Sequence, residues 1–307
     1  AAEVAARSDN FDSPLTPTKF SLKNAETIGA APVSPVKIGK QGFYVTIDET
    51  TLHRMVYNFE AQDYDSVPVG ELNEDYGGDG LLELAVQRKP EPYVWATRAD
   101  GHCVIVLFSP ANKIEGIVRF VTRSGDAVES VCVLKGRVED SVYLWVKRTI
   151  NGSTVRLHEK GALRSEAIGS ATCKLADAGV LNAGPVTTFT GLSHLEGERV
   201  LVWANGVLLN SIATWTFDAN GLVTIDSTFT VSGGQISLGA SYTNVFVGLP
   251  YTGRYKSAKL AYGVQGGTAL MQPKTVHTFG LIGGNIHRDA IRVGPSFAKL
   301  DKYDSEV

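Results

Sequence analysis

Runs of apolar and aromatic residues alternate with short turn signals along most of this chain of 307 residues. In each turn signal a Gly follows Asp, Asn, Ser or Gly; they are Asp79-Gly80, Asp100-Gly101, Asn151-Gly152, Asn205-Gly206, Asn220-Gly221 and Ser232-Gly233-Gly234. Such residues supply the positive φ that tight hairpins require. Helical periodicity is slight, and only residues 1–7 and 254–262 allow a short helix. The pattern therefore predicts a mostly antiparallel, all-β fold.

A weak internal repeat spans residues 85–108 and 131–159. Each copy has an apolar strand, a charged turn, a strand with a Trp, and an Asp-Gly or Asn-Gly hairpin before a third strand. The tryptophans are Trp95 and Trp145, 50 positions apart, and a basic residue follows each at Arg98 and Arg148. That spacing is close to the period of propeller blades. A degenerate third copy falls at residues 42–59, so we expect propeller-like antiparallel blades over residues 33–165.

The rest of the chain divides by composition. We expect an irregular lead-in at the start of a fragment, since the chain begins without Met, then the blades, a linker rich in Ala and Gly, and a small inserted β-sandwich or barrel. The final segment is expected to hold strands that return to the first unit or cover a subunit interface. The boundaries are 1–32 for the lead-in, 33–165 for the blades, 166–184 for the linker, 185–250 for the second β unit and 251–307 for the final segment.

Composition and charge limit the function classes. The chain has 29 Lys and Arg against 32 Asp and Glu, a formal charge of −3 that is too near neutral for the broad basic surface of most nucleic-acid binders. It has no apolar run of about 18 residues and no signal-peptide pattern, so we expect a soluble protein with no membrane insertion. Cys103 and Cys132 lie in apolar runs and Cys173 completes an odd set, so buried thiols are expected and not disulfides.

Catalytic and metal-binding motifs fail on inspection. Residues 191–195 begin like a nucleophile elbow, but Leu195 stands where the closing Gly is needed. Residues 73–80 suggest a calcium loop, but position twelve lacks the required Glu, so a solvated turn is expected. The six histidines show no metal-ligand spacing. We therefore expect a non-enzymatic protein without a cofactor or metal.

Aromatic and basic residues alternate in residues 251–262, YTGRYKSAKLAY. This composition suits a subunit interface, and it also suits a sugar-binding or single-strand-binding face. We expect the interface, with five candidate residues: Tyr251, Arg254, Tyr255, Lys256 and Tyr262.

Seven segments, in order, resemble the C-terminal portion of the tail nozzle proteins of short-tailed bacteriophages, also called tail-stabilisation or tail tubular proteins. They are residues 14–45, 53–64, 84–103, 142–160, 189–206, 245–260 and 293–301. Residues 109–116 depart from the family, which usually shows a strand ending in a Trp-containing segment there.

The resemblance implies a structural protein of the virion tail, assembled in the host cytoplasm. It implies a ring, a homo-hexamer, below an adaptor protein on the portal, with tail fibre or spike proteins as further partners and DNA only passing through the lumen. An alternative is a carbohydrate-binding or host-adhesion β module of a phage tail. A third reading, a glycan-cleaving tail enzyme, needs paired carboxylates in a cleft, which a linear sequence leaves open.

Overall fold

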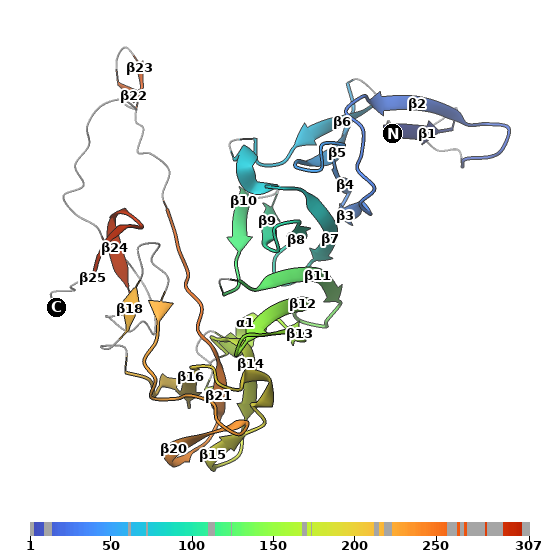
Figure 1. The fold of residues 1–307 in the computed structure, drawn as a ribbon. Coiled ribbons are helices and arrows are strands. Elements are labelled where there is room, and N and C mark those ends of the chain that lie inside the picture. Colours follow the sequence, from blue (N-terminus) through green and yellow to red (C-terminus); the bar gives the residue numbers. More distant parts are fainter. Residues whose placement is uncertain are drawn as a thin grey trace. The chain divides into compact units, whose positions relative to one another are not determined.

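The structure is a computed structural model, shown as a ribbon in Figure 1. It describes residues 3–8, 14–60, 63–71, 73–109, 114–123, 125–167, 171–172, 174–211, 215–217, 223–256, 263–264, 267–268, 280 and 291–302. The chain forms two compact units, the first made of residues 1–168 with 194–196 and the second of residues 169–193 with 197–307. Antiparallel sheets dominate the described residues, and the α-helix described there, α1 (Arg164–Ala167), has four residues. The predicted all-β class is therefore confirmed.

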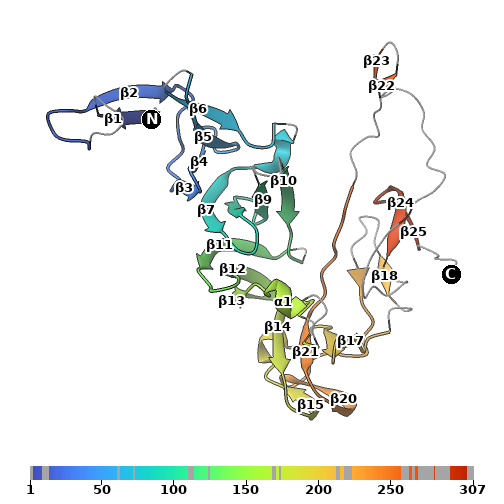
Figure 2. The same cartoon turned by 180° about the vertical axis from the view of Figure 1, so that it is seen from behind.

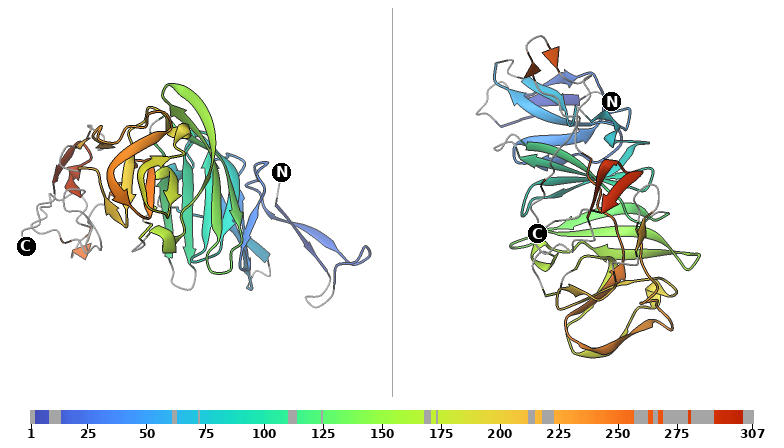
Figure 3. Two further views of the ribbon diagram at one scale, coloured as in Figure 1. Left: turned by 90° about the horizontal axis from the view of Figure 1, so that it is seen from below. Right: turned by 90° about the vertical axis from the view of Figure 1, so that its left-hand side faces the viewer.

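Three antiparallel sheets built from consecutive strands form most of the first unit. Sheet A consists of β3 (Val36–Ile38), β4 (Gln41–Val45), β5 (Leu52–Asn58) and β6 (Asp63–Pro68). Sheet B consists of β7 (Leu81–Gln87), β8 (Tyr93–Arg98), β9 (Cys103–Ser109) and β10 (Ile114–Phe120). Sheet C consists of β11 (Ala127–Leu134), β12 (Ser141–Ile150) and β13 (Ser153–Lys160). The left view in Figure 3 shows the strands of these sheets as successive layers.

Hairpin turns at the predicted places connect many of these strands. Asn151 and Gly152, between β12 and β13, have φ of 46° and 76°. Asn205 and Gly206, in the second unit, have φ of 48° and 78°. Two successive residues with positive φ are the requirement of the tight hairpin turn that Asn-Gly pairs favour. The Asn-Gly hairpins at these two sites are confirmed, whereas Asn220-Gly221 lies outside the described residues.

Sheet B is covered on both faces, because alternate side chains of a strand point to opposite sides. One face, with Val94, Ala96 and Val106, packs against Phe43, Leu52 and other residues of sheet A in a first core. The other face includes Trp95, Cys103 and Phe120. It packs against the inner face of sheet C, where Val131, Leu144 and Val146 lie, in a second core. The order of the layers is therefore A, B, C.

The start of the chain forms a hairpin. The strand β1 (Glu3–Arg7) pairs with β2 (Ser21–Glu26) in an antiparallel register. The short helix that the sequence allowed at residues 1–7 is therefore wrong, and residues 1–32, expected to be irregular, contain two strands. The sequence EVAAR is compatible with a helix locally, but pairing with β2 satisfies its backbone groups as a strand.

The second unit contains two principal sheets, and Figure 2 shows it from behind. One sheet has the order β14 (Asp177–Asn182), β21 (Val245–Leu249), β16 (Leu201–Ala204) and β17 (Val207–Leu208). The other pairs β15 (Val186–Thr190) with β20 (Gln235–Tyr242). Three two-stranded pairs complete it: β18 (Thr216–Phe217) with β19 (Val223–Thr224), β22 (Gly263–Val264) with β23 (Gly267–Thr268), and β24 (Arg292–Ser296) with β25 (Lys299–Lys302).

None of these sheets is closed into a barrel within the described residues. The strand β21 lies inside its sheet, between β14 and β16, and all five of its residues are buried. The strand β14 pairs with it from within residues 166–184, the segment expected to be a linker. Part of that segment is therefore ordered as a strand, because β21 supplies backbone partners on both of its edges.

Candidate functional site

The two basic residues of the internal repeat are both buried ion-pair partners. Arg98 is 6% exposed; its Nη2 lies 2.5 Å from Asp100 Oδ2, and its Nη1 donates a hydrogen bond to the Tyr76 carbonyl oxygen at 2.9 Å. Arg148 is 1% exposed and pairs with two carboxylates. An arginine is almost never fully buried unless it is paired. The basic residue of the repeat therefore has a structural role in both copies.

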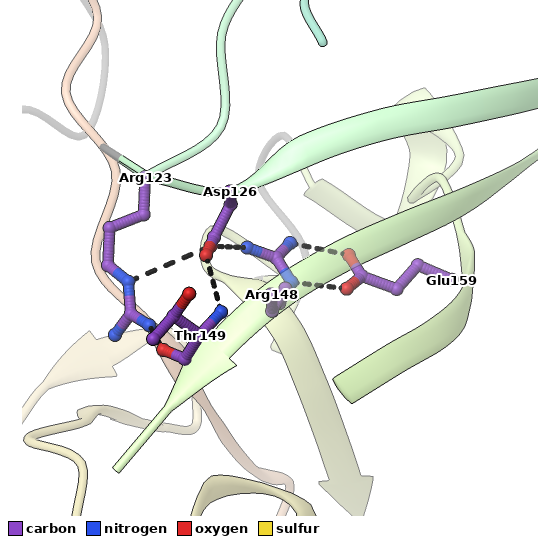
Figure 4. A network of polar contacts seen from close by, with 5 residues as sticks. All are labelled: Arg123, Asp126, Arg148, Thr149 and Glu159. Atoms are coloured by element: carbon purple, nitrogen blue, oxygen red, sulfur yellow. Dashed lines mark hydrogen bonds and ion pairs between the residues drawn. The ribbon is translucent and has the colours of Figure 1, made fainter. Parts of the chain in front are cut away.

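Arg148 is at the centre of a buried polar network in sheet C (Figure 4). Arg148 Nη1 donates to Asp126 Oδ2 at 2.7 Å, while its Nε and Nη2 donate to the two oxygens of Glu159 at 2.5 and 2.7 Å. Asp126 Oδ1 also accepts the backbone N–H of Thr149 at 3.0 Å, and Arg123 Nε lies 3.7 Å from its Oδ2.

This network ties the loop before β11 to β12 and β13. The side chain of Asp126 is 0% exposed and that of Glu159 is 16% exposed, and Arg148 compensates both charges, with Arg123 adding to the compensation at Asp126. Asp126 and Glu159 are ion-paired with Arg148, so they stabilise sheet C. Their arrangement does not support a glycosidase active site at this place.

Residues 73–80 form a turn in which Asn73, Asp75, Gly78 and Asp79 are exposed, as expected, but Tyr76 packs into the first core. Tyr76, in the short 3-10 helix Glu74–Tyr76, is 2% exposed, and its hydroxyl accepts the backbone N–H of Leu52 at 2.6 Å. A Cβ atom on Gly77 would lie 1.7 Å from the Thr50 carbonyl oxygen, so only glycine fits there. Among the described residues, no group of three or more His, Cys, Asp or Glu could hold a metal ion.

A cavity of about 580 Å³ lies beside sheet B in the first unit. Tyr93, Trp95 and Phe120 form its aromatic wall, and Glu91 and Arg164 lie among its polar lining residues. Its volume falls within the usual range of small-molecule sites, and an apolar wall with a few polar groups is the usual composition of such sites. No feature of the linear sequence indicated this cavity, because its lining comes from residues 87–164 on both sides of the second core.

The carboxylates around the cavity are already engaged. Glu91 accepts a hydrogen bond from Arg164 at 3.0 Å, and Glu139 accepts the backbone N–H of Arg164 at 2.7 Å. Burial acts to raise the pKa of Asp140, but the backbone N–H groups of Arg88, Gly136 and Lys89 outweigh it and hold that pKa below its ordinary value. Glu91 and Arg164, 41% and 63% exposed, are therefore the polar groups that a ligand can reach most easily.

Four of the five predicted interface residues lie in the described segment after β21. Tyr251 and Tyr255 are 48% and 87% exposed, and Lys256 is also exposed. The guanidinium of Arg254 lies over the Phe297 ring, 5.4 Å from its centroid, within the usual range of a cation–π contact. Tyr262 lies outside the described residues. The structure thus leaves four of these side chains at the surface, and their role in an interface stays a prediction.

Exposed aromatic residues at both ends of the three-sheet stack were missed by the sequence analysis. Trp145 in β12 is 49% exposed, and Phe59 after β5 is 81% exposed. The alternation of β12, in which Val142, Leu144 and Val146 are buried, was the signal that could have placed Trp145 on the opposite face.

The cysteines divide in a way the sequence did not predict. Cys103 is fully buried, as expected, and burial together with the charge of Glu83 raises the pKa of its thiol to about 12. Cys132 is exposed, so the expectation that it is buried was wrong. The reason is its register, because it pairs with Tyr143 on the face of sheet C that points away from the second core. Cys173 lies outside the described residues.

Comparisons with known proteins leave the function to be inferred from the chain itself. No protein-family model matches the chain, and no curated protein matches it. No helix in the described part of the chain is long and apolar enough to span a membrane.

Proposed function

We propose that this chain is a structural subunit of a bacteriophage tail, a nozzle ring that forms the DNA exit channel below an adaptor protein on the portal. The seven segments that resemble nozzle proteins support the phage assignment. The observation that carries the ring is the stack of sheets A, B and C, which buries both faces of its middle layer but exposes aromatic residues at each end. Such ends favour contacts with further subunits.

Sheets A, B and C are proposed to be propeller-like blades, and the second unit an inserted sandwich. Sheets A and B each contain four consecutive antiparallel strands, which is the organisation of a propeller blade. Sheet C contains three such strands among the described residues.

The ring is proposed to be a hexamer that contacts the portal adaptor and tail fibre or spike proteins, and that is assembled in the host cytoplasm into the virion tail. DNA passes through its lumen without being bound. The near-neutral charge of −3 suits this task, because strong contacts with phosphates would slow the passage of DNA. No catalytic step is proposed.

Electron microscopy of the purified chain in negative stain tests the proposal. The expected images show closed rings with a central channel and sixfold symmetry. Single particles of one subunit at every concentration tested would overturn the proposal.

The aromatic cavity favours a second candidate function, a carbohydrate-binding or host-adhesion module. Trp95 and Tyr93 offer flat apolar surfaces, and Glu91 and Arg164 offer hydrogen bonds at the edge of the cavity. A glycan array probed with the full chain tests this function, with Arg164→Ala as a variant that leaves the buried cores intact. Glycan binding that Arg164→Ala abolishes, by a chain that never forms rings, would favour this candidate over the nozzle.

A further inference from the structure

We propose that copies of this chain join head to tail, with the outer face of sheet C of one copy seated on the outer face of sheet A of the next. The outer face of sheet C is the face opposite the second core, and the outer face of sheet A is the face opposite the first core. This inference rests on the proposed ring and names the surfaces that form it.

The outer face of sheet C presents an aromatic stack. The His158 ring lies parallel to the Trp145 ring at 4.8 Å and to the Tyr143 ring at 5.3 Å. These residues share one face because Trp145 pairs with His158 across β12 and β13. Leu134, at the end of β11 on the same face, is 55% exposed. A sheet face with this much exposed apolar surface is typical of an interaction site.

The internal repeat indicates what covers such a face. Arg98 and Arg148 both point toward the preceding layer, so Trp95 and Trp145 both point toward the following layer. For Trp95 the following layer is sheet C, which covers it together with Phe120, whose ring lies 5.8 Å from the Trp95 ring. Trp145 occupies the corresponding place one layer later. Within the chain, an antiparallel sheet covers the Trp at this position of the repeat.

The outer face of sheet A is open at the end of the sheet where β5 and β6 meet, whereas Tyr44 and His53 on the same face are buried. Leu52 and Arg54 of β5 point into the first core, so Tyr57 points away from it. The Tyr57 ring contacts Phe59 and Tyr64 edge to face, with centroids 5.1 and 5.2 Å apart. Phe59 is 81% exposed and Tyr64 is 37% exposed. This face is therefore aromatic as well, and it has no preceding sheet within the stack.

The charge of the outer face of sheet C also bears on its partner. Lys147 and Lys160 lie on this face beside Arg156, which is paired with Glu129 at 2.8 Å. Two sheet C faces brought together would place like charges opposite one another, which disfavours contact between identical faces. The outer face of sheet A has mixed charge, because Lys37 of β3 is exposed there and Glu60 is exposed at the tip between β5 and β6.

Contact between unlike faces has a geometric consequence. A heterologous contact repeats from copy to copy and closes into a ring when the rotation per subunit allows it. The same contact also buries the exposed aromatic residues at both ends of every stack, which an isologous dimer would not do. The inferred interface thus accounts for both open faces with one contact.

Mixing two blocked variants of the full chain tests the inference. Phe59→Glu blocks the outer face of sheet A, and Trp145→Glu blocks the outer face of sheet C. Val118→Glu is the matched control, because Val118 is 61% exposed on β10 and belongs to neither face. Analytical ultracentrifugation measures self-association of each variant alone and of the mixture, and circular dichroism checks that each is folded.

Each blocked variant alone should self-associate at least about 30-fold more weakly than the wild type, the size expected for losing an aromatic residue at the centre of an interface. The mixture should form a dimer of one copy of each variant and nothing larger, because only one open face of each kind remains. Val118→Glu should assemble like the wild type.

Other results overturn the inference in distinguishable ways. If both blocked variants form rings like the wild type, the proposed function stands but these faces are not its interface. If either folded variant forms a dimer by itself, or the folded pair does not associate, the head-to-tail contact is wrong. If the wild type never self-associates, the ring and the interface fail together. If single-stranded DNA quenches the tryptophan fluorescence of the wild type but not that of Trp145→Glu, and assembly does not depend on Trp145, the outer face of sheet C binds nucleic acid.

Discussion

Removal of the Arg148 side chain tests the claim that buried charges hold sheet C in place. Arg148→Met keeps the length of an unbranched side chain but removes three hydrogen bonds, one to Asp126 and two to Glu159. Asp126, whose side chain is 0% exposed, would lose its closest cationic partner. Breaking a buried pair by removing one member typically costs about 3–5 kcal/mol, because the other charge stays buried without compensation.

The structure places the expected cost near the lower end of that range. Asp126 keeps the Thr149 N–H, and Arg123 lies close enough to compensate part of the charge. With an m-value of about 2 kcal/mol/M for urea, a loss of about 3 kcal/mol lowers the unfolding midpoint by about 1.5 M. Adding Asp126→Asn and Glu159→Gln to Arg148→Met should recover part of the loss, because no unpaired charge then remains buried.

A matched control lies on the same sheet. Arg156 makes two hydrogen bonds to Glu129, but the side chains of both residues are exposed to solvent. In the unassembled chain, Arg156→Met should therefore leave the midpoint within the fitting error, since exposed ion pairs contribute little. Urea unfolding followed by circular dichroism and tryptophan fluorescence measures both variants. An unchanged midpoint for Arg148→Met, or an equal loss for Arg156→Met, would refute the reasoning.

Three further predictions concern stability and thiol chemistry in the first unit. Backbone N–H groups hold the pKa of Asp140 below its ordinary value despite burial. This carboxylate therefore contributes stability above about pH 4, which is lost as the pH falls through the folded-state pKa. Asp140→Asn should lower the urea midpoint at pH 7, and the difference from the wild type should shrink in acid. In a chain with Cys173→Ser, an aromatic disulfide reagent should modify Cys132 rapidly in dilute solution and Cys103 only on unfolding. The absorbance of the released thiolate measures both rates, and equal rates would contradict the assigned burial. Gly77→Ala should lower the free energy of unfolding in urea by about 1–3 kcal/mol, because the new methyl group meets a backbone oxygen. Gly42→Ala is the control and should change stability far less, since no atom lies within 4 Å of its Cβ.

Strands and turns of this chain were predictable because their signals are local. The Asn151-Gly152 pair is a property of two adjacent residues, and its hairpin appears in the structure as predicted. The alternation of β12 is an equally local signal, although the sequence analysis did not use it. The start of the chain shows the limit of such signals. The residues EVAAR of β1 have no strong strand preference, and only the pairing of Arg7 with Ser21 and its neighbours fixes them as a strand.

The environment of individual side chains was not predictable, because it depends on which layer comes next. Trp95 and Trp145 stand at corresponding positions of the repeat, but sheet C covers Trp95 and leaves Trp145 exposed. Cys103 and Cys132 also lie in similar apolar runs, and only one is buried. The candidate cavity depends on contacts between sheets B and C, which no short window of sequence contains.

Native mass spectrometry of the full chain tests the central claim most directly. The account predicts a dominant species with six times the 32.9 kDa of one chain, which Phe59→Glu and Trp145→Glu each reduce to a single chain. A wild-type chain that stays at the mass of one subunit over the whole concentration range would contradict it.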